Sequence, residues 1–150
     1  MLPKILVTIQ LILFALLTAG IIIFPVSSTP FTLLIGALMM TGGLWLVIAA
    51  IREHRINGGV NITPVPRERG QMLHTGLYTR IRHPIYTGVM LAGVGAGVFH
   101  GHYIPLMIAL ILIPFFTIKT FVEESYLRAT YPDYAAYANR TGRFLPPFRR

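Results

Sequence analysis

No charged residue occurs between Ile5 and Ile51, and this uncharged run constrains the fold more than any other feature of the chain. Prolines and small polar residues interrupt the run at Pro25–Pro30 and are typical of a turn. The segments on either side, about residues 5–25 and 31–51, each approach the roughly 20 apolar residues that a helix needs to cross a bilayer. The first segment is longer than the ~7–15 apolar residues of a signal peptide, and no clear small-residue cleavage site follows it. We therefore expect two membrane-spanning helices.

A second uncharged run extends from His83 to Ile118 and is divided by Phe99–His102. It leaves two shorter apolar segments, residues 84–99 and 103–118, which we expect to be the third and fourth spans. The sequence thus predicts an all-α integral membrane protein that forms a single membrane domain over residues 1–150. Its expected parts are four transmembrane helices, a cytoplasmic connecting segment and a short helical carboxy-terminal segment.

The charged residues share one side of such a membrane protein. If four helices alternate in direction, the amino terminus, residues 52–82 and everything after Ile118 lie on the same side. All 13 Lys and Arg residues and all five acidic residues fall in these segments. The positive-inside rule assigns that side to the cytoplasm. We therefore predict a multi-pass protein whose charged face and both termini are cytoplasmic.

The net charge of +8 suggests an anionic partner, either nucleic acid or membrane lipid. Only 12% of the residues are charged, against about 25% in a soluble domain, so little soluble surface exists on which a nucleic acid could bind. We expect contact with membrane lipid and no nucleic acid. The chain has no cysteine, which excludes disulfides, thiolate metal sites and cysteine nucleophiles. His100 and His102 lack a third ligand in the sequence, so no metal site is predicted.

The glycines of the second and third spans indicate close helix packing in lipid. The run from Gly93 to Gly97 lies inside an apolar helix rather than after a strand, so it does not predict a nucleotide-binding loop. Glycine-rich faces serve packing within a chain or between chains, which leaves the oligomeric state open.

Two polar clusters lie where the charged segments meet the apolar spans. The first surrounds Arg82, His83 and Pro84, and Pro84 suits the first turn of a helix because its missing N–H has no partner to lose there. The positive end of that helix attracts a negatively charged ligand group. These residues are therefore candidates for a binding site.

The second cluster continues the fourth helix past the apolar run. Spacing of four places Lys119 and Glu123 on one face, nearest the membrane boundary. Glu124 and Arg128 form a neighbouring pair with the same spacing, which we interpret as a solvated surface pair.

From Pro64 to Phe148 the chain resembles the isoprenylcysteine carboxyl methyltransferase family, which is similar in its carboxy-terminal core to the phospholipid methyltransferases. The resemblance rests on the order and spacing of several short motifs, each weak alone. They are Gly76-Leu77-Tyr78, Arg82-His83-Pro84-Ile85-Tyr86, Glu123-Glu124 with Leu127, Tyr131, Tyr134 and Tyr137, and Arg143-Phe144-Leu145-Pro146.

The resemblance implies a methyltransferase that uses S-adenosyl-L-methionine in a cytoplasm-facing pocket. The residues that it assigns to cofactor binding are Gly70, Gln71, Met72, Leu73, Tyr78, His83, Pro84, Ile85, Tyr86 and Glu123. The family's substrate-side arginine falls on Lys119, which keeps the charge but loses the two-pronged guanidinium. Lys119 and Arg82 are the candidates for orienting an acceptor carboxylate.

A carboxylate acceptor needs no general base, so the protein would supply mainly alignment and a dry, charged pocket. An amine or thiol acceptor would need a base, for which Glu124 is the candidate. The resemblance implies a lipophilic small-molecule or prenylated substrate. Two alternatives stay open: an NADPH-dependent reductase similar in its core to membrane sterol reductases, and a non-catalytic four-helix assembly protein.

Overall fold

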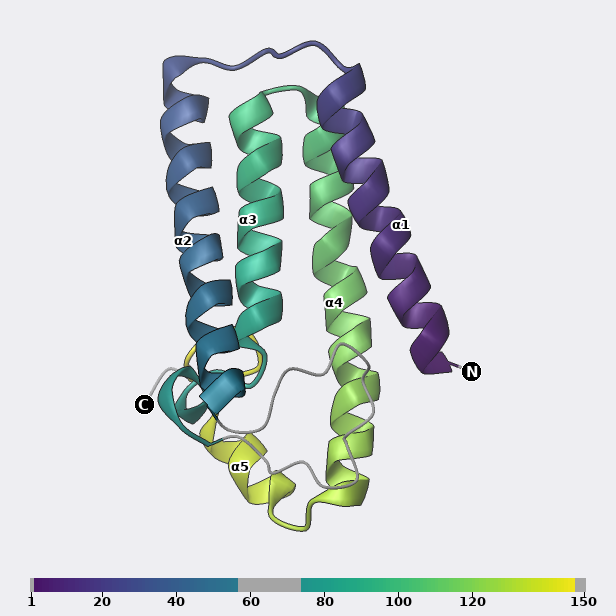
Figure 1. Cartoon of the computed structure of the whole chain (residues 1–150), viewed down its shortest axis with the longest axis vertical. Coiled ribbons are helices and arrows are strands. Elements are labelled where there is room, and N and C mark those ends of the chain that lie inside the picture. Colours follow the sequence, from purple (N-terminus) through teal and green to yellow (C-terminus); the bar gives the residue numbers. More distant parts are fainter. Residues whose placement is uncertain (1, 57–73, 148–150) are drawn as a thin grey trace.

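Four antiparallel helices stand side by side in the computed structural model, and a short fifth helix crosses their charged end (Figure 1). The structure describes residues 2–56 and 74–147. All regular elements within these ranges are helical, as expected from the sequence. They are α1 (Leu2–Ile23), α2 (Pro30–Ile56), the 3₁₀ turn η1 (Gly76–Thr79), α3 (Pro84–His100), α4 (Tyr103–Thr130) and α5 (Tyr134–Arg140).

Within the described residues, the three helices α1, α2 and α4 are long and apolar enough to cross a membrane. Helix α3 is also apolar but has only 17 residues, or about 25 Å at 1.5 Å per residue. Helix α4 passes the predicted end of its span at Ile118 without a break and continues to Thr130. Its second half thereby carries the polar cluster at Lys119–Arg128 out of the apolar region.

Large apolar side chains cover the outer faces of the bundle. Ile22, Phe31 and Trp45 are among those that remain well exposed in the isolated chain. A soluble protein rarely exposes apolar patches of this extent, whereas lipid covers them at no cost. The exposed faces, together with the helix lengths, indicate a multi-pass membrane protein.

Glycines allow α2 and α3 to pack backbone against backbone. A Cβ atom added to Gly43 would lie 2.6 Å from the carbonyl oxygen of Gly88, and one added to Gly88 would lie 2.6 Å from that of Gly43. Gly36 and Gly95 repeat this contact one heptad along each helix, where an added Cβ would meet the backbone of the other helix at 2.5 and 2.8 Å. The expected packing role of these four glycines is confirmed.

The apolar core lies between α1, α3 and α4. Its buried members are Leu6, Leu17, Met90, Ala109, Leu112, Phe115 and Phe116. The aromatic part of this core, at Phe116, lies next to the charged end of the bundle and forms the floor of the site described below.

The ends of the bundle differ in chemistry. The turns α1–α2 and α3–α4 meet at one end, where Gly101 adopts a left-handed conformation (φ 78°) and the Ser27 amide donates to the His100 carbonyl at 3.0 Å. At this end His102 caps α4, because its Nδ1 accepts from the Ile104 amide at 3.2 Å. The start of α1, the end of α2 and α5 lie at the opposite end (Figure 1). The polar clusters predicted from the sequence lie there too.

Substituting Gly43 with alanine tests the contact between α2 and α3. The new methyl group would clash with backbone atoms that have no room to move, so we expect Gly43→Ala to lower the free energy of unfolding by about 1–3 kcal/mol. Gly42→Ala is the matched control, since its Cβ would meet only the Leu91 side chain at 3.8 Å. Thermal unfolding in detergent should show a lower Tm for Gly43→Ala and an unchanged or higher Tm for Gly42→Ala. Equal effects of the two changes would contradict the packing described.

Candidate active site

The carboxy-terminal segment is paired with the chain that leads into α3. Ile81 and Gly142 form a parallel bridge, in which the Gly142 amide donates to the Arg80 carbonyl at 2.9 Å. The Arg82 amide donates to the Gly142 carbonyl at 2.8 Å, and the His83 amide donates to the carbonyl of the following residue, Arg143, at 3.0 Å. The two motifs that carried the resemblance, Arg82–Tyr86 and Arg143–Pro146, are therefore neighbours in space.

Glu124 joins these segments to α4. Its side chain is 3% exposed, and its two carboxylate oxygens accept hydrogen bonds at 3.0 Å from Nε and Nη2 of Arg143. Arg82 Nε donates to the same carboxylate at 3.0 Å, and His83 Nε2 lies 3.3 Å from it. Two guanidinium groups facing one buried carboxylate form a charge-assisted cluster.

The predicted pair of Glu124 and Arg128 is present, but the expectation that it is solvated is wrong for Glu124. Arg128 does lie on the surface, with its side chain 54% exposed, and its Nη2 is 3.7 Å from Glu124. Glu124 itself is buried, because α5 and the carboxy-terminal segment cover this part of α4. A spacing of four residues predicts contacts only along α4 itself. It cannot reveal partners that come from other segments.

The guanidinium of Arg82, a candidate for holding the acceptor, is surrounded by protein groups. Besides Glu124, its Nη1 donates to the Ala138 carbonyl at 2.8 Å and to the Thr141 carbonyl. These contacts fix α5 and the carboxy-terminal segment against the start of α3. In this structure Arg82 therefore holds the fold of the site together.

A stack of rings extends inward from His83. The rings of His83 and Tyr86 are nearly parallel, at 6°, with centroids 5.6 Å apart. Tyr86 stacks in turn on Phe116, with centroids 4.8 Å apart. Pro84, between His83 and Tyr86, is fully buried in the first turn of α3, as the sequence predicted for its position. The motif thus presents one side of α3 as an aromatic wall.

Glu123 faces this wall, while Glu124 faces the arginines. His83 Nδ1 lies 3.8 Å from Glu123 Oε2. The Oε2 atom of Glu123 is buried and has no hydrogen-bond partner within the described residues. A buried carboxylate oxygen without a hydrogen-bond donor destabilises the protein unless a ligand supplies that donor.

Lys119 is the cation beside this carboxylate. Its side chain is 1% exposed, and its Nζ lies 5.1 Å from the centre of the Tyr86 ring and 5.9 Å from that of Phe116. Gln10 Oε1 accepts a hydrogen bond from Nζ at 2.5 Å. The structure therefore brings together four residues singled out from the sequence: His83, Tyr86, Lys119 and Glu123.

Tyr78 lies on η1 beside this group. Tyr137 from α5 donates its hydroxyl hydrogen bond to the Tyr78 carbonyl at 2.8 Å. Burial raises the pKa of Tyr137 to about 12. Burial also raises the pKa of Tyr78, with smaller contributions from Tyr137 and from the negative charge of Glu123. Both phenols are therefore protonated donors at neutral pH.

The resemblance assigns five further residues to cofactor binding. Ile85 is half-buried in the first turn of α3. Gly70, Gln71, Met72 and Leu73 lie outside the residues that the structure describes.

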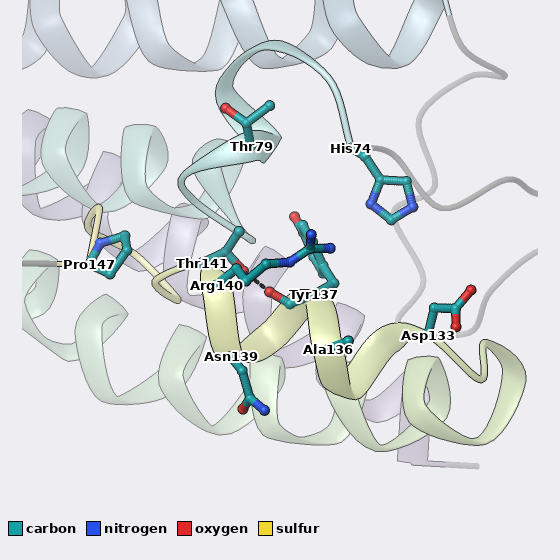
Figure 2. A pocket seen from close by; sticks show the side chains of 9 residues that line it. All are labelled: His74, Thr79, Asp133, Ala136, Tyr137, Asn139, Arg140, Thr141 and Pro147. Carbon is teal, nitrogen blue, oxygen red and sulfur yellow. Dashed lines mark hydrogen bonds between the residues drawn. The ribbon is translucent and has the colours of Figure 1, made fainter. Parts of the chain in front are cut away.

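A hollow of about 990 Å³ lies on the other side of α5 (Figure 2). The residues that line it are His74, Thr79, Asp133, Ala136, Tyr137, Asn139, Arg140, Thr141 and Pro147. None of the residues assigned from the sequence is in this lining. Tyr137 connects the two regions, since it also contacts Tyr78. The hollow is therefore distinct from the aromatic wall of His83 and Tyr86 and from Glu123, which faces that wall.

Sequence reasoning missed the roles of three residues: Gln10, Glu124 and Arg143. Gln10 is the single amide side chain of the first apolar segment, and a strongly polar group inside a span is costly unless it has a partner. That signal could have identified it. The pairing of Glu124 with Arg143 depends on the path of the chain after α4, which no local pattern specifies.

Two comparisons with known proteins bear on this site. Residues 31–134 match the family model described as phospholipid methyltransferase. The chain is also similar to a protein-S-isoprenylcysteine O-methyltransferase of Schizosaccharomyces pombe, with 29% identity over 89 residues. That alignment covers 57% of this chain and 38% of the yeast protein, so the chain matches about two fifths of that relative's length. Both matches are to methyltransferases, and neither favours a reductase or an assembly protein.

Removing the Glu124 carboxylate tests whether it holds the site together. Glu124→Ala leaves two partly buried guanidinium groups without their anion, so we expect a loss of about 3 kcal/mol in the free energy of unfolding. Arg128→Ala removes an exposed ion pair and should cost less than about 1 kcal/mol. Thermal unfolding and the rate of tryptic cleavage after Arg143 measure the two effects. Equal stability of both variants would contradict a central role for Glu124.

Proposed function

The chain belongs to the phospholipid methyltransferase family, and from this we propose that it is a membrane enzyme that methylates a lipophilic acceptor. The proposed methyl donor is S-adenosylmethionine, and the proposed acceptor group is a carboxylate. The observation that carries the proposal is the buried Glu123 Oε2, which lacks a donor and faces an aromatic wall with a buried cation beside it.

The residues around Glu123 suit this cofactor in chemistry. S-adenosylmethionine offers hydrogen-bond donors in its ribose hydroxyls and its ammonium group, which a carboxylate accepts. Aromatic rings attract a sulfonium through their negative faces, and His83 and Tyr86 present such rings. We propose that Tyr78, His83, Pro84, Ile85, Tyr86 and Glu123 contact the cofactor. The resemblance also assigns residues 70–73 to cofactor binding.

The reaction would be a direct displacement. When bound, the cofactor supplies a methyl group whose bond to sulfur breaks as a carboxylate oxygen of the acceptor forms the new bond, which yields a methyl ester and S-adenosylhomocysteine. The carboxylate carries no proton, so no side chain has to act as a base. The protein contributes alignment and a site from which water is excluded, as the burial of His83 and Lys119 supports.

We assign the acceptor carboxylate to Lys119 rather than to Arg82. Three of the five N–H donors of Arg82, those on Nε and Nη1, already serve Glu124 and the Ala138 and Thr141 carbonyls. Lys119 has three N–H donors, of which Gln10 takes one, so it can hold an acceptor oxygen as well. Arg82 is then a positioning residue that fixes the carboxy-terminal segment.

We propose that α3 is a fourth span and that the charged end of the bundle is cytoplasmic. Helix α3 lies along α2 through the glycine contacts, so it occupies the same depth as α2 despite its length. An even number of spans keeps both termini on one side, and the basic residues assign that side by the positive-inside rule. The cofactor would then enter from the cytoplasm.

The acceptor is proposed to reach the site from the lipid. The name of the yeast relative describes an enzyme that acts on an isoprenylated cysteine of a protein. A prenylated cysteine or a smaller amphiphile with a carboxylate would place its apolar tail in lipid and its charged group at Lys119. Because Lys119 lies at the end of the apolar part of α4, the depth suits such a molecule.

Binding of S-adenosylhomocysteine tests the cofactor site directly. Titration calorimetry in detergent should show binding to the wild-type protein and at least a ~10-fold weaker affinity for His83→Ala and Glu123→Ala, because each loses charge-assisted or ring contacts with the ligand. Asp133→Asn alters the hollow on the other side of α5 and should leave the affinity unchanged. Absence of binding to the wild type would contradict the proposed use of S-adenosylmethionine. Loss of binding in Asp133→Asn alone would place the cofactor in the hollow.

Changing Lys119 tests the acceptor site separately. Lys119→Met should lower kcat/KM for a prenylated carboxylate by about 10–100-fold, since it removes a charge-assisted hydrogen bond worth about 1.5–3 kcal/mol. Its affinity for S-adenosylhomocysteine should stay close to that of the wild type. Lys119→Arg keeps the charge and should retain more activity. Wild-type kinetics for Lys119→Met would show that the acceptor binds elsewhere.

A further inference from the structure

Helix α1 supplies a polar group to the site although it lies outside the residues that match the family model. The match covers residues 31–134, whereas α1 ends at Ile23. The side-chain carbonyl oxygen of Gln10 nevertheless accepts a hydrogen bond from Nζ of Lys119, 109 residues later in the chain. Among the described residues, polar side-chain contacts of α1 otherwise stay within the helix itself, where Thr8 and Thr18 bond to carbonyls four residues earlier.

The position of the Lys119 ammonium depends on this contact. Gln10 holds one N–H at 2.5 Å, and the faces of Tyr86 and Phe116 lie on the other sides of Nζ. Lysine has a long, flexible side chain, so without Gln10 its ammonium group would be free to swing within the site. An anion, Glu123, lies four residues later on the same face of α4.

An ion pair between Lys119 and Glu123 would be incompatible with the proposed binding of cofactor and acceptor. It would occupy Oε2 of Glu123, which has no hydrogen-bond partner within the described residues. It would also move the Lys119 ammonium group away from the proposed position of the acceptor carboxylate. In the structure, Lys119 forms its hydrogen bond with Gln10, and Glu123 Oε2 has no hydrogen-bond partner within the described residues. The amide of Gln10 is neutral, so it fixes the ammonium group without cancelling its charge.

We propose that Gln10 is a positioning residue that keeps Lys119 apart from Glu123, so that the cation serves the acceptor and the carboxylate serves the cofactor. The inference rests on the proposed function, since it concerns the same two groups. It makes α1 part of the active site rather than only a membrane anchor.

The test measures S-adenosylhomocysteine binding by calorimetry in the full chain in detergent, in a double-mutant cycle. Gln10→Leu should weaken binding by about 5–10-fold, because Lys119 then pairs with Glu123 and competes with the ligand. In a Lys119→Met background, Gln10→Leu should have no further effect. Gln10→Glu supplies another acceptor for the ammonium group and should bind like the wild type. Thr18→Val is the control for a polar group lost from the same helix.

The possible results distinguish a failure of the proposed role of Gln10 from a failure of the proposed cofactor site. Wild-type affinity in Gln10→Leu, or an equal loss in the Lys119→Met background, would overturn the role of Gln10 while leaving the cofactor site intact. Absence of binding to the wild type would overturn the proposed function and the inference with it. Recovery of binding in the double variant also shows that Gln10→Leu folds, since a misfolded chain would not be rescued by a second substitution.

Discussion

The hydrogen-bonded ion pairs of the buried Glu124 carboxylate are the interaction on which the charged end of this structure depends. The carboxylate accepts from Arg143 and Arg82 and thereby joins α4, the start of α3 and the carboxy-terminal segment. A buried charge is tolerated only when it is paired and hydrogen bonded, so these three segments must come together for any one of them to be stable. The backbone bridge at Ile81 and Gly142 is the geometric result of that pairing.

Two adjacent glutamates thus have different tasks because successive residues of a helix point about 100° apart. Glu124 faces the arginines and is saturated by them, whereas Glu123 faces His83 and Tyr86 and keeps a buried oxygen without a donor. The glutamate that stabilises the fold and the glutamate that faces the proposed cofactor site are therefore adjacent residues of α4. The arginine cluster holds the aromatic wall in place, and the wall is where the proposed cofactor contacts lie.

Much of the fold follows from hydropathy, because lipid forces backbone polar groups to be satisfied within a helix. The uncharged runs therefore predicted α1 to α4, and Pro84 correctly marked the start of α3. The resemblance identified His83, Tyr86, Lys119 and Glu123, which the structure brings together. The burial of Glu124 and the contact between Gln10 and Lys119 were not predicted, since both join segments whose meeting depends on tertiary packing. Local spacing could only suggest the exposed contact with Arg128.

We propose that a carboxylate on a lipophilic acceptor is methylated beside Lys119. The most direct test of this proposal is transfer of labelled methyl from S-adenosylmethionine to a prenylated carboxylate by the purified chain in lipid vesicles. A methyl ester is cleaved by mild base and releases its label as methanol, whereas a methylated amine or thioether is not. We expect labelled product that base releases, and much less of it from Lys119→Met. Label that resists base, or no transfer to any lipophilic carboxylate, would contradict it.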